Sequence, residues 1–177
     1  MTLESDARDF ATRAHARVGQ VRKYSGAPYI VHPQAVADLV RAVPHTEAML
    51  AAAWLHDTVE DTGTTPEEVR AAFGDEVAAL VEMLTDVSRP EDGNRAARKK
   101  IDREHTARAS AAAKTVKLAD LVDNSRSILE RDPGFARVYL EEKAALLEVL
   151  REGDATLWAR AEHIVREGRK LLDASRP

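Results

Sequence analysis

Residues 46–61 read TEAMLAAAWLHDTVED, and the helical class of the fold is most evident here. Its middle, residues 48–55, is apolar on every side of a helix, which is typical of a helix buried at the centre of a bundle. Four ionisable side chains follow: His56, Asp57, Glu60 and Asp61. Residues three or four apart share a helix face, so these groups are expected to converge. Three clustered carboxylates repel one another unless a cation lies among them. The alternative is an ordinary helix end exposed to solvent. The apolar run that leads into these residues, together with the added Glu60 and Asp61, makes it less favoured.

Helical periodicity continues on both sides of this stretch. Apolar residues recur three and four positions apart over residues 6–21, 33–43, 77–84, 114–129 and 154–172. Thr65, Pro66 and Glu68 form a helix-start signal, and Gly74 ends that helix. The last helix is expected to turn Leu171 inward. No segment has a convincing strand pattern, and 31 alanines against 8 glycines and 7 prolines favour helix. We predict an all-α fold, an irregular bundle of about eight to ten helices forming one domain over residues 1–177.

Composition and charge exclude several classes of protein. The 177 residues carry a net charge of −4, whereas a general nucleic-acid binder is usually basic. The longest uncharged hydrophobic run, residues 48–55, is too short to span a membrane, and no signal peptide is recognised, so a cytoplasmic location is expected. Without cysteine there is no disulfide and no thiolate metal site. Residues 95–108 form one basic run, which is either a solvated helix face or an anion site.

Two further elements supply ligands that fit a metal centre. Lys117, Asp120 and Asn124 lie on one stripe of a helix, and His32 stands next to the Pro33 helix start. Together with the central stretch they offer the imidazoles of His32 and His56 and the carboxylates of Asp57 and Asp120. This nitrogen and oxygen set suits Mn²⁺, Fe²⁺ or Zn²⁺. A divalent cation bound by it activates water and polarises a phosphoryl oxygen.

The ordered motifs resemble the HD superfamily of metal-dependent phosphohydrolases. Within it, the similarity is to the hydrolase domain of the RelA/SpoT alarmone enzymes and above all to their small stand-alone relatives. The resemblance covers about residues 14–129, with helices 133–173 expected to pack on this core. It is carried by Ala14-His15, Gly19-Gln20, Arg22-Lys23, Gly26, Pro28-Tyr29-Ile30, His32-Pro33, AWLHD at 53–57, VEDT at 59–62, Phe73-Gly74, and VKLAD at 116–120 with Asn124.

The resemblance implies a role for each matching residue. His32, His56, Asp57 and Asp120 match the four ligands of a single Mn²⁺ per chain. Glu60 and Asp61 match the acidic pair that orients or deprotonates the attacking water. Residues implied to bind the substrate are Arg22, Lys23, Arg98, Lys99, Lys117, Asn124 and Ser127. The implied enzyme is a phosphohydrolase that removes the 3′-pyrophosphate from the guanosine alarmones of the stringent response. Its products are GDP or GTP and pyrophosphate, and its partner is a small nucleotide, with no nucleic acid or membrane.

The sequence departs from the family pattern at two places. Tyr24 is inserted between Lys23 and Ser25, and Leu121, Val122 and Asp123 replace the usual residues before Asn124. We interpret both changes as lying on the substrate side, away from the metal ligands. The base is therefore left open, as are the oligomeric state and the metal loaded in the cell. An adenine alarmone, the 2′-phosphate of NADPH, a cyclic dinucleotide or a nucleoside monophosphate is an alternative substrate. A regulatory domain that binds nucleotide without cleaving it ranks lower, because all six metal and acid residues are present.

Overall fold

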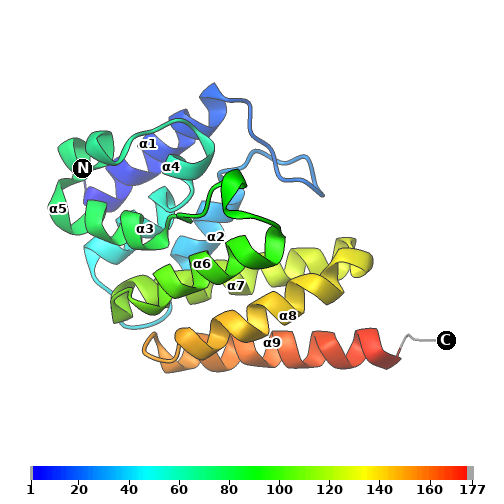
Figure 1. Cartoon of the computed structure of the whole chain (residues 1–177). Helices are drawn as coiled ribbons and strands as arrows, with labels where there is room; N and C mark the ends of the chain where they lie inside the picture. The colour runs from blue at the N-terminus through cyan, green and yellow to red at the C-terminus, as the bar shows by residue number, and fades with distance from the viewer. Residues whose placement is uncertain (1, 175–177) are drawn as a thin grey trace.

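The computed structural model describes residues 2–174, and the prediction of an all-α fold is confirmed (Figure 1). Among these residues the only β pairing is an isolated bridge between Val21 and Pro28. The helices are α1 (Leu3–Arg17), α2 (Val31–Arg41), α3 (Glu47–Leu55), α4 (Thr58–Asp61), α5 (Pro66–Leu84), the 3₁₀ turn η1 (Pro90–Asp92), α6 (Arg95–Ala107), α7 (Ala111–Arg131), α8 (Pro133–Val149) and α9 (Ala155–Ala174). No helix in residues 2–174 combines the length and apolarity needed to cross a membrane.

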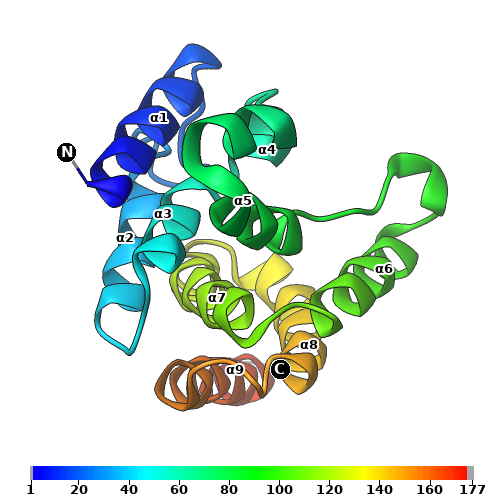
Figure 2. The same ribbon diagram turned by 90° about the vertical axis from the view of Figure 1, so that its left-hand side faces the viewer.

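Helix α3 lies at the centre of the N-terminal half. Every residue from Ala48 to Leu55 is at most 5% exposed, as the all-round apolar pattern predicts. The helix packs against α1, α2, α5 and α7, and Figure 2 shows it among α1, α2 and α5. Because α3 is enclosed, the residue that follows it, His56, is also buried.

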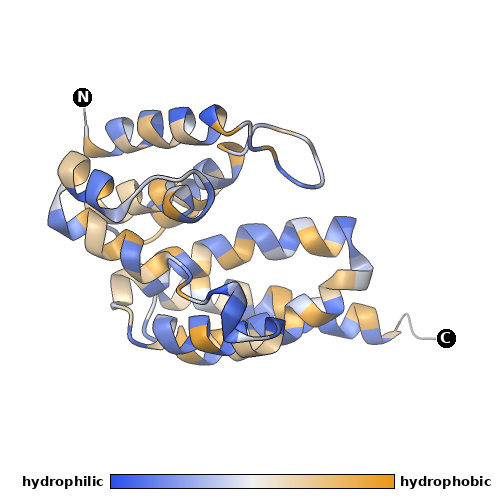
Figure 3. Ribbon diagram, turned by 45° about the horizontal axis from the view of Figure 1, so that its top comes forward, coloured by the Kyte–Doolittle hydropathy of each residue, from blue (hydrophilic) through white to orange (hydrophobic). Residues whose placement is uncertain are grey.

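Helix α7 is the second central helix. It packs against α2, α3 and α5 on one side and against α8 and α9 on the other. The outer helices are amphipathic, and Figure 3 shows apolar and polar residues alternating along them. In α9, Leu157 and Val165 are buried as expected. The prediction that Leu171 faces inward is wrong, since it is 68% exposed. Leu171 lies about 100° around the helix from Leu172, which packs against the core.

Local signals explain where several helices begin and end. Helix α1 ends at Arg17 rather than near residue 21, because Gly19 adopts a φ of 65° and turns the chain. Thr65 and Glu68 form the predicted capping box of α5. Gly74, with a φ of 85°, divides that helix into two segments. The helix predicted over residues 46–59 breaks at His56 and Asp57, so α4 is a separate short turn.

Candidate metal centre and adjoining cavities

Four side chains from three parts of the chain meet beside α7. His32 comes from the first turn of α2, His56 and Asp57 follow α3, and Asp120 projects from α7. The Nε2 of His32 lies 3.1 Å from Asp120 Oδ1 and 3.7 Å from Asp57 Oδ2. The Nε2 of His56 lies 3.0 Å from Asp57 Oδ2 and 3.7 Å from Asp120 Oδ1. The Nε2 atom of each imidazole therefore faces both carboxylates.

These four residues fit a divalent cation. Nitrogen and oxygen ligands about 2.1 Å from a metal lie about 3 Å or more from one another. His32, His56 and Asp57 offer ligand atoms that all lie within 4.8 Å of one another. Asp120 adjoins this group, with Oδ1 3.1 Å from Nε2 of His32 and 3.7 Å from Nε2 of His56. The Nε2 of His56 is buried and has no hydrogen bond, although carboxylate oxygens are nearby. Its other nitrogen, Nδ1, donates to the backbone carbonyl of Ala53 at 2.8 Å, which leaves the lone pair of Nε2 directed at the cluster. A buried nitrogen whose lone pair accepts no hydrogen bond is available to coordinate a metal ion.

The imidazoles and carboxylates of the cluster stabilise one another's charged forms, which shifts their pKa values. Burial alone would lower the pKa of His56, but Asp57 and Asp120 raise it well above its usual value. Burial would raise the pKa of Asp120, but the hydrogen bond from His32 and the neighbouring His56 and Lys117 hold it well below its usual value. The pKa of Asp57 is likewise lowered, chiefly by His56 against the effect of burial. The two carboxylates are therefore ionised at neutral pH, as metal ligands must be.

A surrounding layer of side chains contacts the four residues. Tyr29 donates its hydroxyl hydrogen to Asp57 Oδ2 at 2.6 Å, and the amide of Asn124 donates to Asp120 Oδ1 at 2.8 Å. Lys117 places Nζ 3.6 Å from Asp120 Oδ2. Tyr29 is not among the site residues predicted from the sequence. Its position three residues before His32 was the available signal, because the turn that leads into α2 places both side chains.

Glu60 and Asp61 do not join the cluster as the helical spacing suggested. Because the helix breaks after α3, Glu60 accepts a hydrogen bond from the backbone N–H of Asp86, and Asp61 accepts one from Gln20 Nε2 at 2.9 Å. Burial and the charge of Asp86 raise the pKa of Glu60 to about 7. Burial also raises the pKa of Asp61. The two acids border the metal cluster, each held by a different part of the chain.

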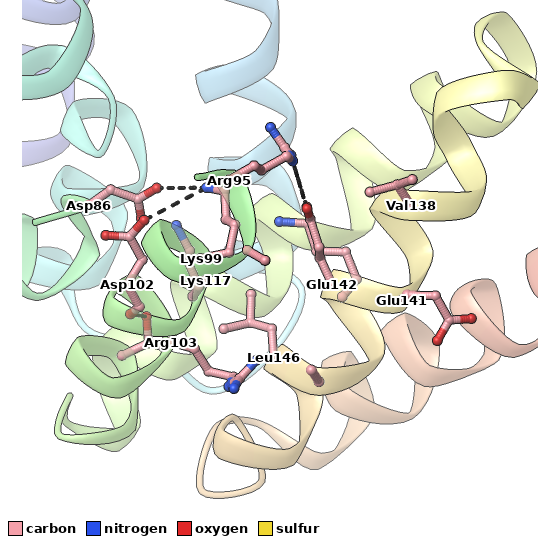
Figure 4. A pocket seen from close by; sticks show the side chains of 14 residues that line it. Asp86, Arg95, Lys99, Asp102, Arg103, Lys117, Val138, Glu141, Glu142 and Leu146 are labelled. Carbon is pink, nitrogen blue, oxygen red and sulfur yellow. Dashed lines mark hydrogen bonds and ion pairs between the residues drawn. The ribbon is translucent and has the colours of Figure 1, made fainter. Parts of the chain in front are cut away.

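A cavity of about 550 Å³ opens between α6 and α8, with Lys117 of α7 among its lining residues (Figure 4). Its walls carry five basic side chains: Arg95, Lys99, Arg103, Lys117 and Lys143. Four acids stand among them: Asp86, Asp102, Glu141 and Glu142. Lys99 donates to Asp86 at 3.0 Å, and Arg95 forms a two-point ion pair with Glu142 at 2.6 and 2.9 Å.

This cavity connects to the metal cluster through two residues. Lys117 lines the cavity and also contacts Asp120, and Asp86 lines it while its N–H bonds to Glu60. Burial, together with the charge of Lys117, lowers the pKa of Lys143 to about 8. An anion bound in this cavity would stabilise the charged form of Lys143 and raise its pKa again, so the cavity favours anionic ligands.

A smaller cavity of about 250 Å³ lies on the other side of His32. Its lining residues include Arg22, Tyr24, Asp123 and Ser127. The inserted Tyr24 donates its hydroxyl hydrogen to Asp132 at 2.9 Å, which ties the loop to the junction of α7 and α8.

The remaining residues predicted to bind the substrate differ in how close they lie to the metal cluster and its cavities. Arg22 donates to Asn124 Oδ1 at 3.2 Å and so lies close to the metal cluster. Lys23 is exposed and lies 3.8 Å from Asp132. Lys99 lines the larger cavity, whereas Arg98 does not, and the Nε of Arg98 is buried without a hydrogen bond. The structure thus brings Lys99 and Lys117 together and leaves Arg98 outside.

An all-helical fold with a buried His/Asp cluster beside a basic cavity fits a metal-dependent hydrolase. Similarity to known proteins identifies the family. The HD domain family model matches residues 7–149, and the chain belongs to that family. The resemblance drawn from the sequence is therefore confirmed.

Some similar proteins match this chain over nearly their whole length, whereas others are much longer and match it over a small part of theirs. Guanosine-3′,5′-bis(diphosphate) 3′-pyrophosphohydrolase MESH1 of Homo sapiens is 36% identical over 172 residues, covering 92% of each chain. The protein of that name from Xenopus tropicalis is 35% identical over 90% of each chain. A probable guanosine-3′,5′-bis(diphosphate) 3′-pyrophosphohydrolase from Synechocystis is 51% identical over 80 residues, and the match spans 10% of its length. A solved metazoan orthologue of SpoT, described as hydrolysing ppGpp, superposes with a TM-score of 0.83 at 31% identity, covering 94% of this chain and 96% of that one.

Proposed function

We propose that this chain is a Mn²⁺-dependent hydrolase that removes the 3′-pyrophosphate from guanosine 3′,5′-bis(diphosphate) and its 5′-triphosphate analogue. The observation that carries the proposal is the His32, His56, Asp57 and Asp120 cluster, which stands between two cavities. Relatives that share 90% or more of their length with this chain bear the name of that activity. The nitrogen and oxygen ligand set accommodates Mn²⁺ without a thiolate.

The residues of the chain divide the chemistry among them. A divalent cation, when bound, lowers the pKa of a bound water from about 16 toward 7 and polarises a phosphoryl oxygen. Glu60, whose pKa is about 7, accepts the proton of the attacking water, and Asp61 orients that water. The water oxygen bonds to phosphorus as the bond between phosphorus and the 3′-oxygen of the nucleotide breaks, and the 3′-oxygen takes the proton that Glu60 accepted from the water.

The larger cavity receives phosphates in this proposal. Lys99, Lys117 and Lys143 offset the negative charge that the substrate brings toward an acid-rich centre. The smaller cavity, which adjoins His32 and is lined by Tyr24 and Ser127, receives the base. Asn124 and Arg22 lie between the base and the metal ligands.

A substrate panel with Mn²⁺ tests the activity. Purine 3′-pyrophosphate nucleotides with guanine or adenine, NADPH and a nucleoside monophosphate are incubated with the protein, and the products are identified. Release of pyrophosphate from the guanine compound is expected. Release of phosphate from NADPH alone would show that NADPH, and not the guanosine compound, is the substrate. Faster turnover of the adenine compound would show that the substrate is an adenine nucleotide. No turnover of any compound, with nucleotide still bound, would point to a regulatory domain. Asp57→Ala should lose bound metal, as measured by elemental analysis.

A pair of neighbouring lysines tests the phosphate cavity. Lys99 lines it, whereas Lys100 is 67% exposed on the same helix and pairs with Glu104. Lys99→Ala should raise KM at low salt, and the effect should shrink as salt screens the charge over about 10 Å at 0.1 M. Lys100→Ala removes the same charge and should leave KM unchanged. Equal effects of the two variants would favour a solvated helix face.

A further inference from the structure

Asp123 is one of the departures before Asn124, and it lines the smaller cavity as a substrate-side residue would. It also reaches the metal cluster, since its Oδ2 lies 2.6 Å from Nδ1 of His32. The reason is helical geometry, because Asp123 follows Asp120 by three residues and shares its face of α7.

The two nitrogens of His32 face different groups. Nε2 points into the cluster, 3.1 Å from Asp120 Oδ1, while Nδ1 points at Asp123. The ring is 1% exposed, so in the folded protein these carboxylates, and not bulk water, are the partners of its nitrogens. A metal ion needs the lone pair of Nε2, which requires the proton of the neutral ring to be on Nδ1. A carboxylate beside Nδ1 accepts that N–H and fixes both the tautomer and the direction of the ring.

The other imidazole of the cluster is supported differently. His56 donates from Nδ1 to the backbone carbonyl of Ala53 at 2.8 Å. That acceptor is uncharged and belongs to the main chain, so no substitution removes it. The orientation of His32, in contrast, depends on one side chain. A substitution at residue 123 should therefore affect one ligand of the centre and leave the other in place.

Asp123 is itself held in position. Arg22 places Nη2 3.7 Å from Asp123 Oδ2 and donates to Asn124 Oδ1 at 3.2 Å. Asn124 in turn donates to Asp120 Oδ1. The side chain of Arg22 is 16% exposed, so this bridge is largely protected from solvent. The loop that carries Arg22 is thereby joined to two of the metal ligands.

We propose that Asp123 is a positioning residue of the metal centre, which accepts the Nδ1–H of His32 and so directs Nε2 at the metal. The inference rests on the metal site of the proposed function but is independent of the substrate. It assigns a supporting role to a residue at which this chain departs from the pattern of the family it resembles.

Direct measurement of Mn²⁺ binding tests the proposal. Free Mn²⁺ is titrated by electron paramagnetic resonance against the wild type, Asp123→Ala and Asp123→Asn at one pH. Loss of such a partner typically weakens metal affinity about 10- to 100-fold, which is expected for Asp123→Ala. Asn keeps a neutral acceptor for the N–H, and neutral hydrogen bonds are about half as strong as charged ones, so Asp123→Asn should lose about 3- to 10-fold.

A matched control separates orientation from charge. Glu130 lies on α7 and lines the same small cavity, so Glu130→Gln removes one negative charge without touching His32. Its Kd for Mn²⁺ should stay within about twofold of the wild type, given that one exposed charge is largely screened. An equal loss in Glu130→Gln and Asp123→Ala would overturn the proposal.

A spectroscopic readout reports the hydrogen bond itself. In the diamagnetic Zn²⁺-loaded protein, the Nδ1–H of His32 should give a slowly exchanging proton resonance that Asp123→Ala loses. Wild-type Mn²⁺ affinity in Asp123→Ala would overturn the inference alone. If that variant does not fold, unchanged affinity in Asp123→Asn would do so. A wild-type protein that binds no Mn²⁺ would overturn both this inference and the metal site on which it rests.

Discussion

Replacing Asp102 with alanine should destabilise the protein through a loop that also reaches the active site. Asp102 is a buried carboxylate on α6. Its Oδ1 accepts the backbone N–H of Val87 at 3.0 Å and of Ser88 at 2.9 Å, and its Oδ2 accepts the hydroxyl of Ser88 at 2.8 Å. Those three bonds fasten the segment after α5 to α6. The same segment carries Asp86, whose N–H bonds to Glu60.

The size of the effect follows from those three bonds. A protein hydrogen bond contributes about 1 kcal/mol net, and one to a charged group about 1.5–3 kcal/mol. Val87 is 45% exposed, so the segment lies at the surface, and rehydration offsets part of the loss once the carboxylate is gone. We therefore expect Asp102→Ala to lower the free energy of unfolding by about 2–3 kcal/mol. For a chain of this length that corresponds to a fall in Tm of about 4–12 °C.

Urea denaturation followed by circular dichroism measures this change. Asp102→Asn is the matched control, because its Oδ1 still accepts both N–H groups and the Ser88 hydroxyl can reverse its role. The control should lose about 1 kcal/mol or less. A loss below about 0.5 kcal/mol in Asp102→Ala would show that the loop is held by something other than these bonds.

Three further predictions concern catalysis, pH and packing. Glu60→Gln should keep its metal and lose about 10²–10⁴ in kcat, since an amide cannot accept a proton; a kcat within about threefold of the wild type would exclude that role. Protonation of Glu60, whose pKa is about 7, should lower kcat/KM on the acid side. A bound cation lowers that pKa, so the pH profile of the loaded enzyme should bend below pH 7, and a bend above pH 7 would contradict the assignment. Gly153→Ala should cost about 1–3 kcal/mol by thermal unfolding, because the new Cβ would lie 2.7 Å from Leu118 and 3.0 Å from the backbone carbon of Lys114. Gly134→Ala, whose Cβ has no contact closer than 3.9 Å, should be neutral.

The parts of the fold that local chemistry controls could be predicted from the sequence. The capping box at Thr65 and the apolar run before His56 act within one or two helical turns, and the structure agrees with both. The break at His56 and Asp57 could not be predicted, because it depends on α7 and the loop after α5 supplying partners for the residues around it. The assumption of one continuous helix therefore placed Glu60 and Asp61 in a single cluster that they do not form.

The candidate site shows a similar division. His32, His56, Asp57 and Asp120 could be named because their types and order resemble a family pattern. The partner of His32 could not, since the two residues are 91 positions apart and nothing local relates them. Arg98 and Lys99 are neighbours of equal charge, and only the packing of α6 against α8 decides which one lines the cavity.

The spacing of the four clustered residues along the chain has a consequence for the order of events during synthesis. His32, His56 and Asp57 leave the ribosome within a short interval, and Asp120 follows 63 residues after Asp57. A growing chain therefore presents an incomplete set until α7 has emerged and packed against α2 and α3. Metal binding is coupled to folding in such a case. The metal is therefore selected by the folded protein and not by the nascent chain. Which ion binds first then depends on the metal ions available where folding is completed.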